Sequence, residues 1–342
     1  MTPRVEDFRG DAGEWDRFVA SMDGSGYLAH DWRGILGRGM GHETQYLAAR
    51  AGSELRGILP LVRMRSRLFG NFLVSLPFVT HGGLLCRDEA AGTALLAAAG
   101  NLRQELGAAY VELRHASGMG LELPARTHKV AMVLPLGADE AAMWRGLNTK
   151  VRNQVRKAEK SGLRTVQGGR ELLDDFYGVF ARNMRDLGTP VLARSFFAQV
   201  LWAFPHGTRI LSVRLGSRAV AAGFLYWHGN TLEIPWASSI RGCNHLCPNN
   251  LLYWETIRTG LALGLTRFDL GRSSPGAGTF KFKEQWGARP QALSWHYLLP
   301  PGRALPDLTP SNPRYALAIN AWRRLPVPLT RLVGPAVVRC IP

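Results

Sequence analysis

Two lysines within a glycine-rich segment are the residues whose type and spacing point most clearly to chemistry. The segment, residues 271–287, contains four glycines and one proline, a composition that allows backbone to approach a ligand closely. Lys281 and Lys283 alternate with two phenylalanines, so an extended segment would present both lysines on one face. Only six of the 42 basic residues are lysines. A lysine in a cleft can stabilise an oxyanion or hold a phosphate; the alternative is an ordinary strand with its polar side in water.

Polar residues around this segment extend the candidate site. Residues 265–270 form a predicted strand that places Asp269 and Arg272 at its end. Asp269 can orient or deprotonate an amine, or it only caps the strand. We therefore take Lys283 and Asp269 as candidate catalytic residues. The candidate substrate-binding residues are Lys281, Arg272, Ser273, Gly278, Thr279, Trp236, Asn249, Asn250 and Tyr253, with a core position as the alternative for Trp236.

A basic helix is predicted over residues 148–160. An apolar stripe runs along it through Leu147, Val151, Val155 and Ala158, and Gly162 is a plausible stop. Lysines and arginines occupy the remaining faces, and Glu159 is the only acid. Like charges four residues apart repel by a few tenths of a kcal/mol, so we expect the helix to bind phosphate; a solvated face is the alternative. The candidate phosphate-binding residues are Lys150, Arg152, Arg156 and Lys157.

The net charge of the whole chain also indicates a phosphate-bearing partner. The 342 residues carry a formal charge of +16, yet residues 1–145 hold 16 basic and 16 acidic residues, so the excess lies in the second half. This asymmetry favours a phosphate-bearing partner, namely nucleic acid, a nucleotide or CoA, an anionic sugar-lipid or an anionic membrane surface. The alternative is an arginine-rich solvated surface.

Composition and missing motifs exclude several classes. A hydrophobic content of 46% is that of a globular protein. Four cysteines form no disulfide framework and suit a reducing compartment, and no apolar run reaches the roughly 18 residues of a membrane span, so we expect a cytoplasmic protein without a transmembrane segment or signal peptide. The chain lacks a P-loop and a G-x-S-x-G motif. Cys243, His245 and Cys247 do not have zinc-site spacing, and we expect no metal.

An internal duplication organises the chain. Residues 47–53 (LAARAGS) match 211–217 (LSVRLGS), and 107–113 (GAAYVEL) match 264–270 (GLTRFDL), at similar offsets. In the second copy, helices are predicted at 171–187, 194–204 and 249–263, and strands at 209–215, 219–227, 231–237, 265–270 and 291–298. Helices, an antiparallel meander, a helix and a strand form the order of a GNAT N-acyltransferase, although other α+β folds share it.

Several motifs together resemble FemAB-like proteins. They are F-D-L-G-R-S…G-x-G-T-F-x-F-K-x-x-W-G (268–287), L-N-T-K-V-R-N-Q-V-R-K-A-E-K-S-G (147–162), R-N-M-R-D-L-G-T-P (182–190), G-F-L-Y-W-H-G (223–229), I-P-W-A-S-S (234–239) and C-P-N-N-L-L-Y-W-E (247–255). The closest resemblance is to the subgroup associated with exosortase and exopolysaccharide loci. It implies an α+β fold of two tandem GNAT-like domains with a mixed, largely antiparallel sheet. Lys283 matches the family lysine linked to phosphate binding and transition-state stabilisation.

The resemblance also implies a function. It is the transfer of an acyl or aminoacyl group to an amine on a cell-envelope or exopolysaccharide precursor, a small-molecule or lipid-linked sugar. The donor is acyl-CoA or aminoacyl-tRNA, and no tightly bound cofactor is expected. The long helical hairpin of tRNA-dependent members is absent, and so is the usual pyrophosphate loop of acetyl-CoA enzymes. The alternative function is a non-catalytic module that binds RNA or an anionic glycolipid through the basic half.

The expected domains are a first GNAT-like domain (1–145), a basic connecting helix (146–170), a second GNAT-like domain with the active site (171–300) and a Pro-rich basic tail (301–342). A short basic helix is predicted at 315–325 in the tail, followed by an apolar end. The tail is either a weak interfacial anchor at the inner face of the membrane or a strap packed on the first domain.

Overall fold

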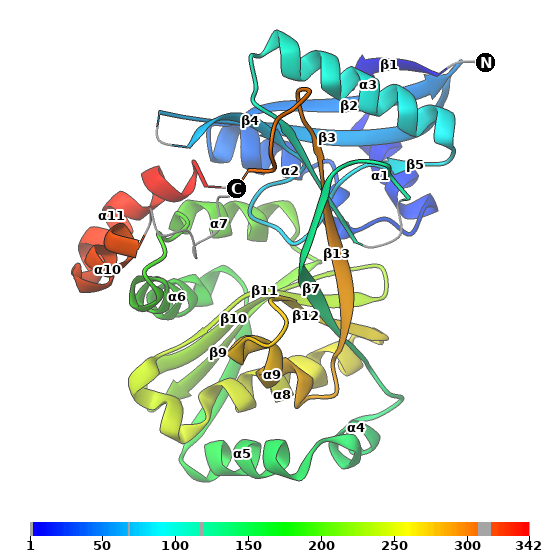
Figure 1. Ribbon diagram of the computed structural model, residues 1–342. Coiled ribbons are helices and arrows are strands. Elements are labelled where there is room, and N and C mark those ends of the chain that lie inside the picture. Colours follow the sequence, from blue (N-terminus) through cyan, green and yellow to red (C-terminus); the bar gives the residue numbers. More distant parts are fainter. Residues whose placement is uncertain (1–2, 68, 117–119, 307–315, 342) are drawn as a thin grey trace. The chain divides into compact units, whose positions relative to one another are not determined.

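The computed structural model describes residues 3–67, 69–116, 120–306 and 316–341 and divides into two compact units (Figure 1). Unit 1 comprises residues 1–129, 292–307 and 339–342, and unit 2 comprises residues 130–291 and 308–338. This division differs from the boundaries expected at residues 145, 170 and 300. The difference arises because β7 (Ala125–Pro135) and β13 (Arg289–Leu298) each begin in one unit and end in the other.

Unit 1 is a sheet with strand order β1-β2-β3-β4-β6-β13. The pairing of β4 with β6 is parallel, and the other pairings along this order are antiparallel. Its core includes apolar residues of β2, β3 and α3. Its elements are β1 (Arg4–Asp7), α1 (Ala12–Ser21), η1 (Gly26–Leu28), α2 (Trp32–Gly34), η2 (Ile35–Gly39), β2 (Glu43–Ala51), β3 (Glu54–Ser66), β4 (Gly70–Val74), β5 (Leu85–Cys86), α3 (Glu89–Glu105) and β6 (Val111–Ala116).

Unit 2 is a sheet with strand order β7-β12-β11-β10-β9-β8, covered on one face by α6 and on the other by α8 and α5 (Figure 1). The pairing of β11 with β12 is parallel. Its elements are α4 (Glu140–Gly146), α5 (Thr149–Lys160), β8 (Leu163–Gly168), η3 (Arg170–Leu172), α6 (Leu173–Leu187), α7 (Arg194–Ala203), β9 (Thr208–Leu215), β10 (Arg218–His228), β11 (Thr231–Ser239), η4 (Arg241–Leu246), α8 (Pro248–Ala262), β12 (Arg267–Ser273), α9 (Gly278–Glu284), α10 (Ala316–Arg324) and α11 (Val327–Val338).

The two units repeat one plan, which confirms the predicted α+β fold of two GNAT-like domains. In each unit four strands pair in sequence order, a helix follows the fourth, and the next strand pairs with the fourth in parallel. A strand from the other half of the chain then completes each sheet: β13 pairs with β6, and β7 pairs with β12. The two hairpins matched in the sequence are β2–β3 and β9–β10.

Local sequence explains where the helices of unit 2 begin and end. The side chain of Asn148 accepts a hydrogen bond of 2.8 Å from the Lys150 amide and caps α5. Gly162, at φ +80°, takes the left-handed conformation that ends the helix. Pro248 occupies the first turn of α8, where its missing amide leaves no hydrogen bond unmade. The helices predicted at 148–160, 194–204 and 249–263 are confirmed within one residue at each end.

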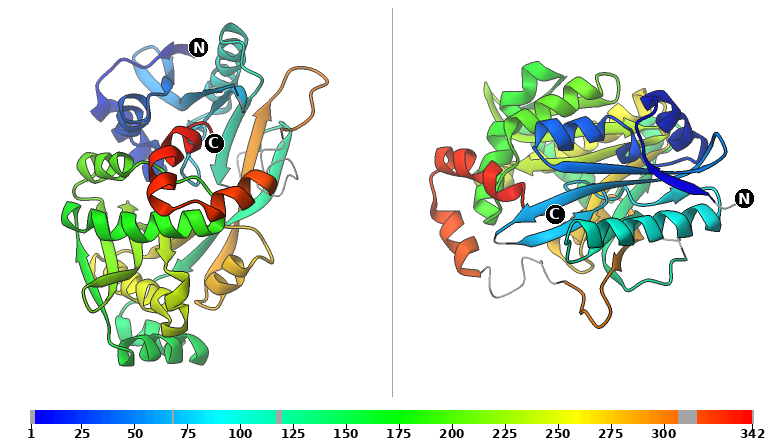
Figure 2. Two further views of the ribbon diagram at one scale, coloured as in Figure 1. Left: turned by 90° about the vertical axis from the view of Figure 1, so that its left-hand side faces the viewer. Right: turned by 90° about the horizontal axis from the view of Figure 1, so that it is seen from above.

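The tail is divided between the two units. Its helices pack on unit 2, where the predicted strap on the first domain does not apply, whereas residues 339–342 belong to unit 1 and Arg339 donates to the Gly41 carbonyl over 3.1 Å. The tail helices α10 and α11 lie against α6 (Figure 2, left). Arg185 of α6 donates to the Leu325 carbonyl over 2.9 Å, which fixes the end of α10. The predicted helix at 315–325 is observed as 316–324, while Tyr315, Pro310 and Pro313 lie outside the described residues. The apolar end forms a second helix, α11.

A buried histidine pair joins β6 to β13 within unit 1. His115 Nε2 accepts a 2.9 Å hydrogen bond from the Leu84 amide, and its Nδ1 lies 3.1 Å from Nδ1 of His296. Neutral His115 must therefore carry its proton on Nδ1 and donate it to His296. Burial, followed by the charge of His296, lowers the pKa of His115 to about 3.

This pair makes the stability of unit 1 pH-dependent. An unfolded histidine titrates near pH ~6.5, well above the folded pKa, so the unfolded state binds more protons below that pH. We expect the free energy of unfolding to fall by up to about 1.4 kcal/mol per pH unit below ~6.5. Urea unfolding near neutral and mildly acidic pH measures this loss. In His115→Gln the loss should shrink; an unchanged pH dependence in that variant would contradict the assignment.

Candidate functional site

The candidate site lies in unit 2, where two parallel strands part. The pairing of β11 with β12 covers three positions and ends at Glu233 opposite Asp269. Beyond this point β11 stays paired with β10 as far as Ser239, and β12 follows β7 as far as Ser273. A register shift in β12 between Asp269 and Arg272 marks the divergence. Backbone groups that would otherwise bond across the sheet become available to side chains or ligands there.

Lys283 fills the start of this opening. Its Nζ donates to the carbonyl oxygens of Gly271, at 2.8 Å, and Arg272, at 3.0 Å. A Cβ on Gly271 would lie 3.6 Å from Nζ and 3.8 Å from the Ile234 carbonyl oxygen. The ammonium group therefore lies beside Gly271 of β12, close to the point where β11 and β12 part. The residue is only 7% exposed, so its charge is held by backbone dipoles rather than by water.

The segment that carries the lysines is a helix, which corrects the expected extended strand. Residues 278–284 form α9, and Lys281 is exposed while Lys283 is buried. The two lysines therefore lie on different faces. Helical spacing brings Phe282 and Trp286 onto the ring of Tyr253 of α8, with ring centroids 5.1 and 6.0 Å apart. This aromatic contact holds α9 in the orientation that directs Lys283 into the opening.

Asp269 lies on β12 at the last position that pairs with β11. It is 4% exposed, and its Oδ1 accepts a 2.7 Å hydrogen bond from the Gly271 amide. Burial raises the pKa of its carboxyl to about 6, opposed by that hydrogen bond and by the charge of Lys283. Burial lowers the pKa of Lys283 to about 8, opposed by the charge of Asp269. A buried acid and a buried base thus stabilise each other's ionised forms near neutral pH.

The remaining residues of the glycine-rich segment divide into exposed and buried groups. Arg272, Gly278 and Thr279 are exposed, whereas Ser273 and Tyr253 are buried. Ser273 Oγ and Trp286 Nε1 are buried and have no hydrogen-bond partner among the described residues. Such groups usually have a partner in native proteins, so both can serve a bound molecule. Burial raises the pKa of Tyr253, which keeps its phenol neutral.

The residues expected to line an acceptor pocket do not all come together. Trp236 packs against Phe196, Phe197 and Phe224, with ring centroids 5.3 to 5.5 Å away, in the aromatic layer under α7. It is therefore a core residue, the alternative left open by the sequence. Asn250 is buried and donates to Gln154 of α5 over 3.1 Å, while Asn249 is half-buried at the start of α8.

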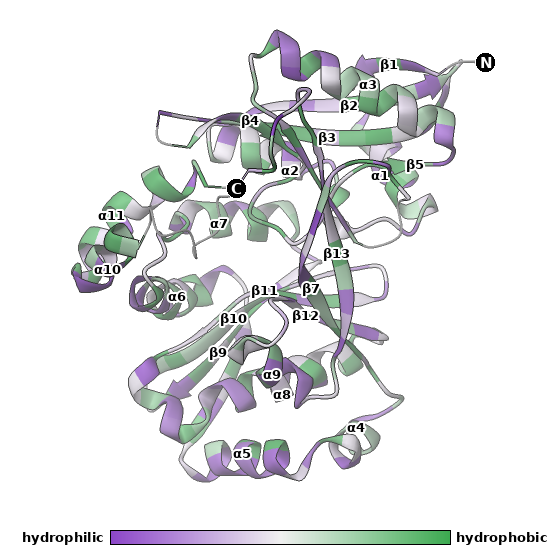
Figure 3. Cartoon of the chain, in the orientation of Figure 1, coloured by the Kyte–Doolittle hydropathy of each residue, from purple (hydrophilic) through white to green (hydrophobic). Residues whose placement is uncertain are grey.

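The basic helix α5 presents its charges outward. Val151, Val155 and Ala158 are buried against the core of unit 2, and Figure 3 colours much of α5 purple. Arg156 lies 5.4 Å from the ring centroid of Trp144. Lys150, Arg156 and Lys157 are exposed, and Arg152 is half-buried with a 3.2 Å hydrogen bond to Thr149. Three of the four cations are thus accessible to a phosphate.

Glu233 was not predicted from the sequence as a site residue. It is the only acid in the apolar strand β11, it is 7% exposed, and it stands opposite Asp269 at the last paired position. A buried acid in a strand of apolar residues is uncommon, and that signal was present in the sequence. Glu233 adds a second carboxyl at the point where the strands part.

The corresponding place in unit 1 is closed by the chain itself. There β4 and β6 pair as far as Val74 opposite Glu112, and residues 75–84 then bond along β6. Ser75 Oγ accepts from the Arg114 amide, and the Glu112 carboxylate accepts from Arg114 Nε at 2.7 Å and from the Tyr297 hydroxyl at 3.0 Å. The charge of Glu112 is therefore neutralised by Arg114, whereas Asp269 of unit 2 lies beside Lys283.

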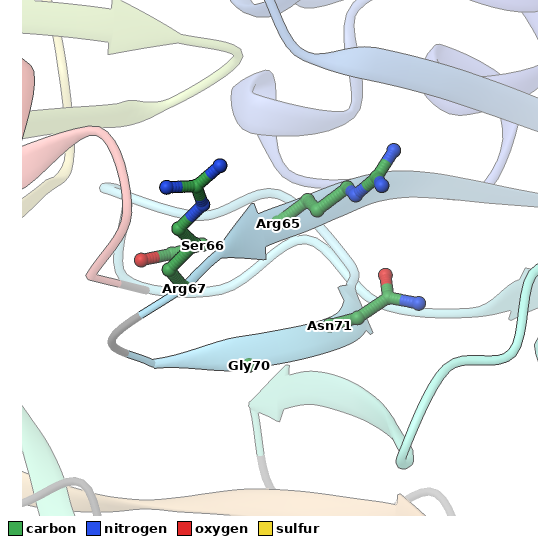
Figure 4. Close-up of a pocket in the computed structure, with 5 residues that line it drawn as sticks. All are labelled: Arg65, Ser66, Arg67, Gly70 and Asn71. Carbon is green, nitrogen blue, oxygen red and sulfur yellow. The ribbon is translucent and has the colours of Figure 1, made fainter.

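A surface pocket in unit 1 offers a different chemistry. Figure 4 shows it at the β3–β4 hairpin, lined by Arg65, Ser66, Arg67, Gly70 and Asn71. The Asn71 amide is already bound to the Leu106 and Gly107 carbonyls. The lining contains no carboxyl or lysine that could serve as a base, so we place the candidate chemistry in unit 2.

Within the described ranges, no group of three or more His, Cys, Asp or Glu side chains is placed to hold a metal ion. None of the described helices combines the length and apolar character needed to cross a bilayer.

Comparison with known proteins agrees with this fold. Residues 145–284 match the family model described as an acetyltransferase (GNAT) domain, a range that includes α5, Asp269 and Lys283. No curated protein matches the chain significantly.

Solved structures share the fold at low sequence identity. FemX superimposes with a TM-score of 0.65 and 14% identity, covering 86% of this chain and 97% of its own. The C-terminal domain of a lysylphosphatidylglycerol synthetase from Agrobacterium fabrum gives 0.56 and 12%, covering 83% and 91%. A tandem GNAT protein from the clavulanic acid biosynthesis pathway gives 0.55 and 13%, covering 86% and 96%.

The class of protein follows from the fold and the family match together. The chain has a tandem GNAT architecture with an acetyltransferase (GNAT) domain in its second half. It is an acyltransferase.

The two shifted pKa values predict a bell-shaped pH dependence of acyl transfer. Asp269 is ionised above pH about 6 and Lys283 is protonated below pH about 8, so the rate should peak between these values if both charges are needed. Asp269→Asn should remove the acid limb. It should also move the alkaline limb to lower pH, because the carboxylate raises the pKa of Lys283. A pH–rate profile that keeps both limbs in this variant would contradict the pairing.

Proposed function

We propose that unit 2 transfers an acyl or aminoacyl group from an activated donor to an amine, with the reacting carbonyl bound where β11 and β12 part. The observation that carries this proposal is the buried ammonium group of Lys283 beside Gly271, close to the point where β11 and β12 part. A fixed positive charge in a water-poor site stabilises the oxyanion that develops when an amine attacks a carbonyl.

In the proposed step, the neutral amine forms a bond to the carbonyl carbon of the donor. The carbon–sulfur bond of a thioester, or the carbon–oxygen bond of an ester, then breaks. The proton that the amine loses passes to the Asp269 carboxylate, and Asp269 then gives it to the leaving thiolate or alkoxide, so that the carboxylate is restored. Asp269 suits this role because burial raises the pKa of its carboxyl to about 6, closer to that of an amine than an exposed carboxyl would be.

The donor is proposed to be acyl-CoA or aminoacyl-tRNA, both of which carry phosphates. GNAT domains use acyl-CoA as co-substrate, which the family match over residues 145–284 supports. Support for an aminoacyl donor comes from the fold shared with FemX. The exposed cations of α5, Lys150, Arg156 and Lys157, are proposed to bind donor phosphate.

The acceptor is proposed to be an amine on a cell-envelope or exopolysaccharide precursor, either a small sugar or a lipid-linked one. This rests on the motif resemblance to the exosortase-associated FemAB-like subgroup and on the fold shared with a lysylphosphatidylglycerol synthetase domain. The reaction would then take place at the cytoplasmic side. The non-catalytic alternative, an RNA or glycolipid module, relies only on the positive charge and leaves the buried Lys283 and Asp269 without a role.

Lysine substitutions test the catalytic assignment. We expect Lys283→Met to lower kcat/KM by about 100-fold or more, the usual loss when an oxyanion-stabilising group is removed. The matched control is Lys160→Met, which removes an exposed lysine of unit 2 that is not among the candidate site residues and should change the rate less than about threefold. Rates are measured as transfer of labelled acyl groups from acyl-CoA, or of labelled amino acids from aminoacyl-tRNA, to amino-sugar acceptors.

A folding control is needed because Lys283→Met removes the hydrogen bonds that Lys283 donates to the Gly271 and Arg272 carbonyls, and the loss of a buried hydrogen bond costs about 1–3 kcal/mol. Circular dichroism and thermal unfolding must therefore show that the variant is folded at the assay temperature. If folded Lys283→Met transfers as fast as the wild type, the assignment is wrong. Salt-sensitive RNA binding without any transfer would support the binding module instead.

A further inference from the structure

An outward-facing apolar surface on the tail has no role in acyl transfer. It consists of Leu317 of α10, which is 84% exposed, and Leu329, Leu332 and Val333 of α11, of which Leu332 is 78% exposed. Figure 3 colours α11 largely green, that is, hydrophobic. We call these four residues the tail surface. Large exposed apolar side chains on two successive helices of a folded protein suggest a contact with a partner or a membrane.

The orientation of α11 is fixed, so this exposure follows from the packing of the helix. Thr330 and Gly334 are buried toward the body of unit 2. A Cβ on Gly334 would lie 3.0 Å from the Val191 amide nitrogen and 3.1 Å from the Val191 side chain, which shows how closely the helix is seated. Arg331 extends the contact by lying 4.9 Å from the ring centroid of Tyr177. With that face inward, Leu329 and Leu332 must point outward.

α10 is fixed to the same helix of unit 2. Its last turn is held by the 2.9 Å hydrogen bond from Arg185 to the Leu325 carbonyl, and Arg323 donates to the Leu187 carbonyl over 3.3 Å. A Cβ on Gly188 would lie 2.5 Å from the Ile319 side chain, so the inner face of α10 is in close contact with the end of α6. Leu317 therefore stays on the outer side together with the exposed Arg324.

The charge of these helices selects the kind of partner. Residues 316–338 contain three arginines and no aspartate or glutamate. Arg323 and Arg331 contact α6, which leaves Arg324 on the outer side beside the apolar residues. An arginine beside exposed apolar side chains, with no acid nearby, is characteristic of helices that lie in the interface of an anionic membrane, where the apolar side chains enter the acyl chains and the guanidinium group lies at the headgroups. A helix of 12 residues such as α11 is about 18 Å long, so it would lie on a bilayer rather than cross it.

We propose that the tail surface docks unit 2 onto an anionic lipid bilayer, with Leu317, Leu329, Leu332 and Val333 inserted at the interface and Arg324 at the headgroups. This goes beyond the proposed acyl transfer, since it concerns where the enzyme works. It would keep unit 2 at a surface that displays lipid-linked acceptors. Binding to a bilayer needs neither donor nor acceptor, so it can fail or succeed independently of catalysis.

Vesicle flotation of the full chain tests the docking. The probes are vesicles of phosphatidylcholine with and without phosphatidylglycerol. We expect the wild type to float with the anionic vesicles, and its partitioning to fall in about 0.5 M salt, where screening is strong. Leu329→Ser combined with Leu332→Ser should reduce partitioning by about tenfold or more, since two inserted side chains are lost. Arg324→Ala should reduce it by roughly fivefold, the effect of one charge removed.

A matched control uses exposed leucines elsewhere on unit 2. Leu215 is 40% exposed and Leu263 is 37% exposed, compared with 42% for Leu329. Leu215→Ser combined with Leu263→Ser should float as the wild type does. The proposal is overturned if the wild type ignores anionic vesicles, or if the Leu329/Leu332 variant floats as well as the control. It is also overturned if sedimentation shows that the tail surface joins two copies of the chain and the vesicles do not compete with that dimer.

Discussion

The contact on which the site depends is that of a buried lysine with two backbone carbonyls. β12 leaves β11 beyond Asp269, and its register with β7 shifts between Asp269 and Arg272. Lys283 donates to the carbonyls of Gly271 and Arg272 there, with Nζ 2.8 and 3.0 Å from the two oxygens. An unpaired buried carbonyl and an unpaired buried ammonium are each costly. Their pairing stabilises the parted strands and holds a positive charge between them.

The rest of unit 2 serves to hold that pairing. The aromatic group of Tyr253, Phe282 and Trp286 fixes α9, and the Gly271 amide fixes the Asp269 carboxylate. Gly271 is at φ +82°, a conformation that favours glycine, and it has no Cβ to crowd the ammonium group. Unit 1 has the same strand plan, but its opening is occupied by residues 75–84 and its acid is bound by Arg114 and Tyr297. The two units therefore share one arrangement of strands but carry different residues at the place where the strands part.

Much of the fold could be predicted from the sequence because its signals were local. The helix caps at Asn148 and Pro248 and the Gly-Ser turns of both hairpins place elements to within a residue or two. The site was harder to predict. The alternation of Phe and Lys in residues 280–283 indicates a strand, yet α9 forms because Phe282 and Trp286 pack on Tyr253 from a distant helix. The exchange of β7 and β13, and the docking of the tail on α6, likewise rest on contacts between residues far apart in sequence.

We propose that an activated acyl group binds between the parted strands of unit 2, beside Lys283. Photo-crosslinking tests this most directly. An acyl-CoA analogue with a diazirine in its acyl chain is irradiated with the protein, and the labelled peptides are mapped by mass spectrometry. We predict labels within residues 234–239 and 268–287, and their loss when unmodified acyl-CoA competes; the corresponding aminoacyl-tRNA analogue serves as the second donor. Labels confined to residues 73–84 and 111–116 of unit 1 would contradict the claim.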